Sequence, residues 1–76
     1  MEKKKLQEVI LLIASRFEWL RTNRDSRGTR LSSACRLAYA GEIRGCCFVL
    51  YKVGLIQEKQ AAKIARAAEK RARYEL

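Results

Sequence analysis

Histidine and proline are both absent from this chain of 76 residues, and only eight of its residues are acidic. Without histidine, catalytic triads and dyads built on imidazole are excluded. A zinc site would need three thiolates and a carboxylate, and the cysteines at positions 35, 46 and 47 lack the usual C-x₂-C spacing. We therefore expect no enzymatic activity, no bound metal and no cofactor.

Long hydrophobic runs are absent as well, since no stretch reaches the roughly 18 apolar residues of a membrane span. The lysines at 3–5 followed by Val9–Ala14 imitate a signal peptide, but Arg16 and Glu18 interrupt the apolar run without a small-residue cleavage site. Three cysteines also differ from the four or six spaced cysteines of a secreted scaffold. We expect a cytoplasmic protein with buried, reduced thiols and no membrane association.

With no proline and four glycines, few positions interrupt the secondary structure. Hydrophobic residues make up 49% of the chain, which is enough to form a core and argues against disorder. The pattern predicts an all-α fold, a small three-helix domain over residues 1–76 with helices at about 2–21, 30–53 and 57–74. We expect a central apolar helix and an alanine-rich, basic C-terminal helix.

The first predicted helix has one continuous apolar face: Leu6, Val9, Ile10, Ile13, Phe17 and Leu20. Leu12 and Trp19, seven residues apart, lie on the flank of this face and widen it beyond what one neighbouring helix needs. They either pack on the third helix or form part of a protein interface. For a three-helix domain, packing within the core is the favoured alternative.

The second predicted helix is apolar on several sides, which places it at the centre of the domain. Thr29 is its best N-cap with Ser26 as a rival, and Gly54 is predicted to form a left-handed C-cap. Glu42 falls among apolar neighbours, where pairing with an arginine from another element is the usual solution. Four small residues predict close packing against the first helix, or else a kink: Ala34, Ala38, Gly41 and Gly45.

The third predicted helix has a narrow inner face with one large apolar side chain: Ala61, Ile64, Ala65, Ala68 and Ala72. Such a helix gains stability from the helix propensity of alanine more than from burial. We therefore expect it to be attached lightly to the core or to project beyond it.

The other side of this helix carries a row of cations, which we call the basic stripe: Lys59, Lys63, Arg66, Lys70 and Arg73. Their spacing keeps all five within about a quarter of the helix circumference, over a rise of about 21 Å. Such a row can follow a polyanion backbone, or it can be a solvated face. Glu69, which is not part of the basic stripe, lies four residues before Arg73 and is spaced to form an ion pair with it.

A second basic feature, which we call the arginine loop, separates the first two helices: Arg21, Arg24, Arg27 and Arg30. Guanidinium groups on a flexible polar loop suit bidentate phosphate contacts and base edges, so we expect this loop to bind an anion. The lysines at 3–5 add a third patch. The lysines and the arginine loop lie at opposite ends of the first helix. If the third helix spans the distance between those ends, the three patches form one basic side of the protein.

The net charge of +9 and a pI near 10.0 favour an anionic partner. Our first hypothesis is a small protein that contacts the phosphates of DNA or RNA with the basic stripe and the arginine loop. The alternative is a compact inhibitor or adaptor, of the kind phages and mobile elements encode, that acts on host nucleic-acid machinery. It would dock its basic surface on an acidic patch of a partner protein, or it would use an interface whose apolar centre is formed by Leu12, Trp19 and the small residues of the second helix. Both are compatible with a homodimer.

Overall fold

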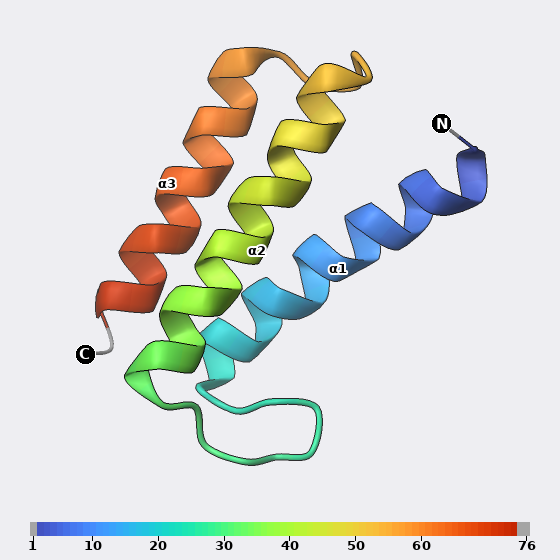
Figure 1. Ribbon diagram of the computed structural model, residues 1–76. Coiled ribbons are helices and arrows are strands. Elements are labelled where there is room, and N and C mark those ends of the chain that lie inside the picture. The colour runs from blue at the N-terminus through green and yellow to red at the C-terminus, as the bar shows by residue number, and fades with distance from the viewer. Residues whose placement is uncertain (1, 75–76) are drawn as a thin grey trace.

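The part of the chain that the structure describes forms three helices. The computed structural model describes residues 2–74, with the backbone alone at Tyr74, and places α1 at Lys3–Thr22, α2 at Ser33–Lys52 and α3 at Glu58–Tyr74. These residues contain no strand, so the all-α, three-helix prediction is confirmed. Figure 1 shows α2 running antiparallel beside α3 and packing also on α1. No helix within residues 2–74 is long and apolar enough to cross a bilayer.

Local hydrogen bonds define where α2 begins. The Ser32 hydroxyl accepts a hydrogen bond from the Cys35 N–H at 3.2 Å and so caps the helix. The predicted N-caps, Thr29 and Ser26, are wrong because an antiparallel bridge between Arg24 and Arg30 folds those residues into a separate hairpin.

At the other end of α2, the predicted left-handed cap at Gly54 is confirmed by its φ of 80°. The Gly54 N–H bonds the Tyr51 carbonyl and the Leu55 N–H bonds the Leu50 carbonyl, both at 3.0 Å. This pair of bonds closes the helix and turns the chain toward α3.

The core lies along one side of α2, where buried residues recur at spacings of four and three: Arg36, Ala40, Ile43, Cys47 and Leu50. The inner face of α3 packs against this side and is buried at Ala65, Ala68 and Ala72. Because these alanines are small, the two backbones approach closely, and the α2–α3 contact is the most extensive in the protein. The expectation of a lightly attached third helix is therefore wrong.

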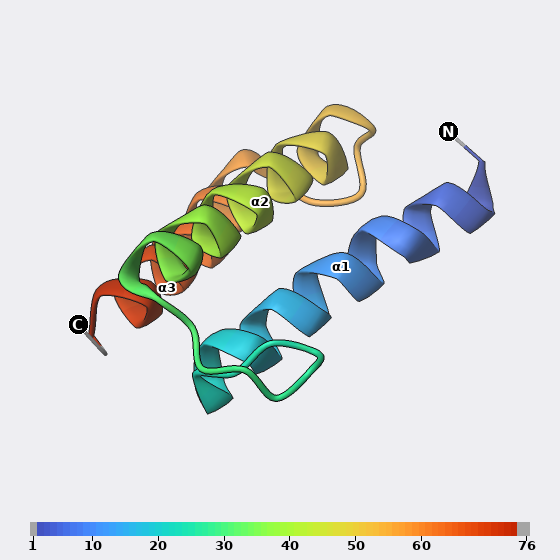
Figure 2. The same cartoon turned by 60° about the horizontal axis from the view of Figure 1, so that its bottom comes forward.

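The helix that projects is α1. Its C-terminal half is anchored by Leu20, which is fully buried, and by Ile13 and Phe17, which pack on the core. Its N-terminal half diverges from α2 and α3 (Figures 1 and 2), which leaves Ile10 and Leu11 50% and 67% exposed. The first helix, more than the third, is the one that extends beyond the core.

The row of small residues on α2 does not contact α1. Ala34, Ala38, Gly41 and Gly45 are all exposed, and nothing lies within 4 Å of a Cβ built at either glycine. The prediction of close packing here is wrong because both neighbouring helices pack on the opposite side of α2, which carries the larger buried side chains.

Arg36 is the one charged side chain buried in the described core, with 1% of its surface exposed. Its guanidinium donates to the carbonyls of Leu20 (3.2 Å), Arg71 (2.8 Å) and Ala72 (3.1 Å), and to Asn23 Oδ1 (2.7 Å). The planar fork of arginine suits such a spread of acceptors. One side chain of α2 therefore joins the C-terminal turns of α1 and α3.

We expect Arg36→Met to lower the free energy of unfolding by about 3 kcal/mol, because methionine fills similar space but leaves buried carbonyls without donors. Urea unfolding followed by far-UV circular dichroism measures the change. Arg44→Met is the matched control: it removes an exposed arginine and one ion pair from the same helix, at a cost below about 1 kcal/mol. Equal losses in the two variants would contradict the role assigned to Arg36.

We expect the double variant Gly41→Ala, Gly45→Ala to raise the free energy of unfolding by about 1–2 kcal/mol, because alanine restricts the unfolded chain and meets no neighbour at either site. The same measurement on Gly54→Ala should show a loss, since its φ of 80° disfavours any side chain. Destabilisation by the double variant would mean that this face of α2 is covered in solution, as in a homodimer.

Candidate nucleic-acid interface

The basic stripe lies on the outer side of α3, opposite the buried alanines, and all five of its cations are exposed. The predicted pair of Glu69 with Arg73 is not formed, because Glu69 Oε1 instead lies 2.9 Å from Nη2 of Arg44 on α2. Within residues 2–74, no ion pair engages any member of the basic stripe. Its charge is therefore available to a ligand.

Part of the basic stripe surrounds a shallow hollow of about 450 Å³, lined by Arg66, Glu69, Lys70 and Arg73. Three cations converge on it from successive turns of one helix, while Arg44 neutralises Glu69, the single carboxylate among the described lining residues. This local excess of positive charge suits an anionic group such as a phosphate.

The arginine loop is an ordered hairpin, and the expectation of a flexible segment is wrong. Asp25 Oδ1 accepts hydrogen bonds from the N–H groups of Arg27 (2.8 Å) and Thr29 (2.9 Å). The Arg24 guanidinium donates to the Gly28 carbonyl at 2.8 Å, across the turn. A φ of 79° at Gly28 allows the chain to reverse there. The loop therefore presents fixed positions to a ligand.

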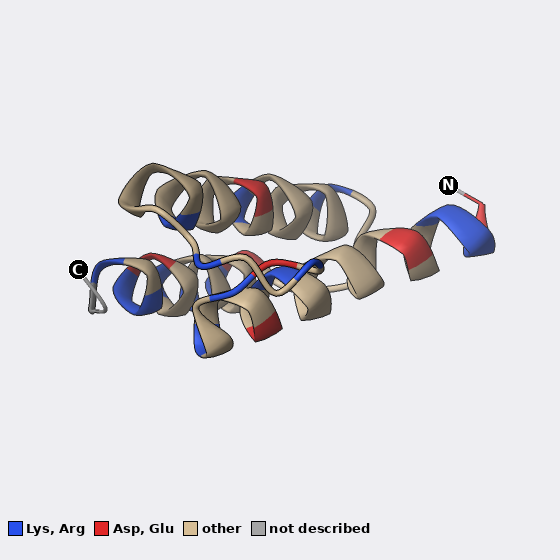
Figure 3. Cartoon of the chain, turned by 90° about the horizontal axis from the view of Figure 1, so that it is seen from below, with Lys and Arg blue, Asp and Glu red and all other residues tan. Residues whose placement is uncertain are grey.

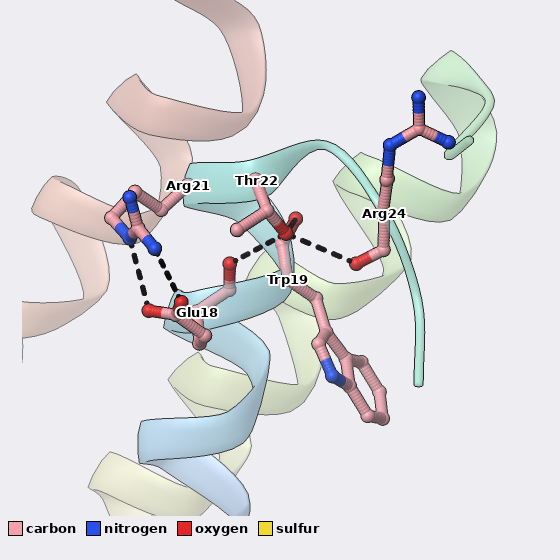
Figure 4. Close-up of polar contacts among 5 residues, drawn as sticks. All are labelled: Glu18, Trp19, Arg21, Thr22 and Arg24. Atoms are coloured by element: carbon pink, nitrogen blue, oxygen red, sulfur yellow. Dashed lines mark hydrogen bonds and ion pairs between the residues drawn. The ribbon is translucent and has the colours of Figure 1, made fainter. Parts of the chain in front are cut away.

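The four arginines of this loop do not form one cluster. Arg27 and Arg30 are exposed, and among the described residues no ion pair engages the guanidinium group of either. Arg21 belongs to the last turn of α1, and its Nε donates to Glu18 Oε2 at 3.0 Å while its Nη2 contacts the other carboxylate oxygen (Figure 4). The hydrogen bond from Arg21 lowers the pKa of Glu18, so the carboxylate stays ionised beside it.

A groove of about 620 Å³ runs between α1 and α3, and it joins the two predicted basic features. Its apolar part is formed by Ala14 and Phe17 of α1 and Ala67 of α3. Its polar part consists of the following side chains: Glu18, Arg21, Lys70 and Arg71. Lys70 is also a member of the basic stripe and of the hollow on α3. The groove therefore opens directly beside the row of cations.

Sequence reasoning missed Arg71 and Phe17 as parts of this surface. The signal for Arg71 is its position four residues after Ala67 and seven after Ile64, on the flank of α3 between the buried face and the basic stripe. The sequence places Phe17 on the apolar face of the first helix, and its side chain does pack on the core while also lining the groove.

The lysines at positions 3–5 do not join this surface. Figure 3 shows them at the start of α1, far from the C-terminal end of α3 and the hairpin. The divergence of α1 separates the two groups of charge, so the single basic side anticipated from the sequence is not formed.

Trp19 lies in the α1–α2 contact rather than against α3. Its ring is 5.2 Å from that of Tyr39, and the Arg16 guanidinium lies 4.3 Å above it. Arg16 Nε also contacts Glu42 Oε2 at 2.6 Å. The expected pairing of Glu42 with an arginine of another element is thus confirmed, and the Glu42 side chain is 45% exposed. Leu12, like Trp19, is half-buried.

The three thiols are free and differ in exposure, so the expectation that all are buried is wrong. Cys47 is buried, Cys46 is half-buried and Cys35 is exposed. Burial raises the pKa of both the Cys46 and Cys47 thiols, and Glu42 adds to the shift at Cys46. In the described part of the chain, no three residues among Cys, Asp and Glu gather closely enough to hold a metal ion.

No family model, no curated protein and no solved structure matches this chain.

Proposed function

We propose that the chain is a cytoplasmic protein that binds the phosphate backbone of a nucleic acid, with the basic stripe as its principal contact. The observation that supports this most directly is a row of five exposed cations on α3, none of them paired within residues 2–74. Duplex DNA carries one negative charge per about 1.7 Å of its axis, so a row of about 21 Å can face several phosphates.

The docking of α3 strengthens this proposal. A helix fixed by buried Ala65, Ala68 and Ala72 presents its cations at a constant spacing, so little backbone order is lost when a polyanion binds. Arg27 and Arg30 of the hairpin would add contacts at the edge of the same surface. Contacts to phosphates position a nucleic acid without reading its sequence, so we propose little sequence preference.

A protein-binding inhibitor or adaptor is the second candidate, and the outer face of α2 favours it. Leu37 and Phe48 are 45% and 57% exposed beside Gly41 and Gly45, so an apolar strip of helix faces solvent. An affinity pull-down after nuclease treatment separates the two candidates. Partners that survive nuclease support the adaptor, whereas partners that disappear support nucleic-acid binding.

We expect binding to a short duplex to weaken with salt, with a log–log slope of about −4.5 if all five cations of the basic stripe neutralise phosphates. Reversing three of them, with Lys63→Glu, Arg66→Glu and Lys70→Glu, should flatten the slope to about −2 and weaken binding at low salt at least about tenfold. Fluorescence anisotropy across a salt series measures both quantities.

The matched control reverses the lysines at positions 3–5 to glutamate. Each triple variant lowers the net charge by the same amount, three reversals of two charges each. A change of slope as large in the control as in the variant of the basic stripe would show that overall charge, rather than α3, carries the binding. Absence of binding at 50 mM salt would remove the proposal altogether.

A further inference from the structure

The groove between α1 and α3 combines two kinds of surface that a phosphate backbone alone does not need. Lys70 and Arg71 supply positive charge beside the ion pair of Arg21 with Glu18, whereas an apolar wall is formed by Ala14, Phe17 and Ala67. Its volume of about 620 Å³ falls within the range of small-molecule and cofactor sites. Phosphates can be held by the cations, but the apolar wall requires a different group beside them.

The groove is held open by the way its two walls are attached. α1 and α3 both pack on α2 and have little contact with each other. Ala14 and Ala67 are too small to fill the space between them. At the loop end, Arg36 donates to the Leu20 carbonyl of one wall and to the Arg71 and Ala72 carbonyls of the other. The two walls are thereby kept at a fixed separation before any ligand arrives.

We propose that this groove receives an unpaired base of a single-stranded nucleic acid, whose backbone lies along the basic stripe. The proposal rests on the proposed function and names the form of nucleic acid that the surface suits. Lys70 lines both the groove and the hollow on the outer side of α3, so a strand on the stripe passes the mouth of the groove. There a base can turn in against Phe17 while its neighbouring phosphates meet Arg21 and Arg71.

A duplex cannot fill this groove without being disrupted. Its bases are paired and stacked, so one of them would have to be flipped out first. A single strand already offers unstacked bases, and proteins that bind single strands combine a positive groove with aromatic side chains. The protein is therefore expected to prefer a single strand over a duplex of equal length.

The test compares a single strand, a duplex and an abasic single strand of equal length by fluorescence anisotropy at one salt concentration. We expect the base-bearing strand to bind about tenfold more tightly than the abasic strand, because contact with one base is lost in the latter. It should also bind more tightly than the duplex. The probes are made in DNA and in RNA, which share this chemistry, and a preference in either supports the assignment.

Ala67→Leu is the decisive variant, because Ala67 is exposed and leucine is well tolerated in a helix. Filling the groove should remove the preference for base-bearing strands and leave duplex binding unchanged. Ala38→Leu, at an exposed alanine on the outer face of α2 and away from the groove, is the matched control and should keep the preference. An Ala67→Leu protein that folds and still prefers the base-bearing strand would overturn the assignment.

A substitution of Glu18 provides an independent test, because it should tighten binding where Ala67→Leu weakens it. Among the described residues that line the groove Glu18 is the one carboxylate, and it lies where a phosphate would approach Arg21. Glu18→Gln should therefore tighten binding of the single strand about fivefold, as expected for removal of one like charge at close range in water. Unchanged or weaker binding would contradict the placement of a phosphate beside Arg21.

The failures of the two proposals are distinguishable. If neither single strand nor duplex binds, backbone binding by the basic stripe is wrong. If base-bearing strand, abasic strand and duplex all bind equally, or if heparin competes as well as the single strand at equal charge, backbone binding stands and base recognition in the groove is wrong. Tight binding of an acidic amphipathic peptide in the groove, with no preference for base-bearing strands, would also overturn the assignment.

Discussion

Burial of the Arg36 guanidinium, with no carboxylate partner among residues 2–74, is the constraint on which the packing of this protein depends. A buried charge is tolerated only when its hydrogen-bonding groups are satisfied, and here backbone carbonyls at the ends of α1 and α3 satisfy it. Neither helix can shift along α2 without losing these bonds. The core itself is small and rich in alanine. The hydrogen bonds of Arg36 therefore fix the relative positions of the helices more firmly than apolar packing alone would.

Periodicity was sufficient to predict the three helices, the inner face of α3 and the basic stripe, because each depends only on spacing within one helix. The docking of α3 was predicted wrongly. The sequence argument weighed the small area of each alanine side chain, whereas the structure shows that alanines let two backbones approach closely. The prediction for the small residues of α2 is wrong in the opposite sense. Gly41 and Gly45 would allow close packing of a second helix, but no helix of the described structure packs against them.

Contacts between elements account for what sequence reasoning missed. Arg36 occupies the same helical register as Ala40 and Ile43, so its burial could have been suspected, but its acceptors are backbone atoms of other helices. The groove depends on how α1 and α3 are placed around α2, and no spacing within one helix encodes that. The hairpin resembles a flexible loop in composition, yet Asp25 orders it through hydrogen bonds to backbone N–H groups.

The position of Arg36 also has an electrostatic consequence for the surface beside it. The C-terminus of a helix behaves roughly as half a negative elementary charge, and α1 and α3 end close together near Arg21 and Arg71 (Figure 1). Two such ends sum to about one negative charge, which by itself would repel a phosphate. The positive charge of Arg36 cancels that sum from within the core. The negative ends of the two helices therefore do not oppose the attraction of a polyanion to the exposed cations nearby.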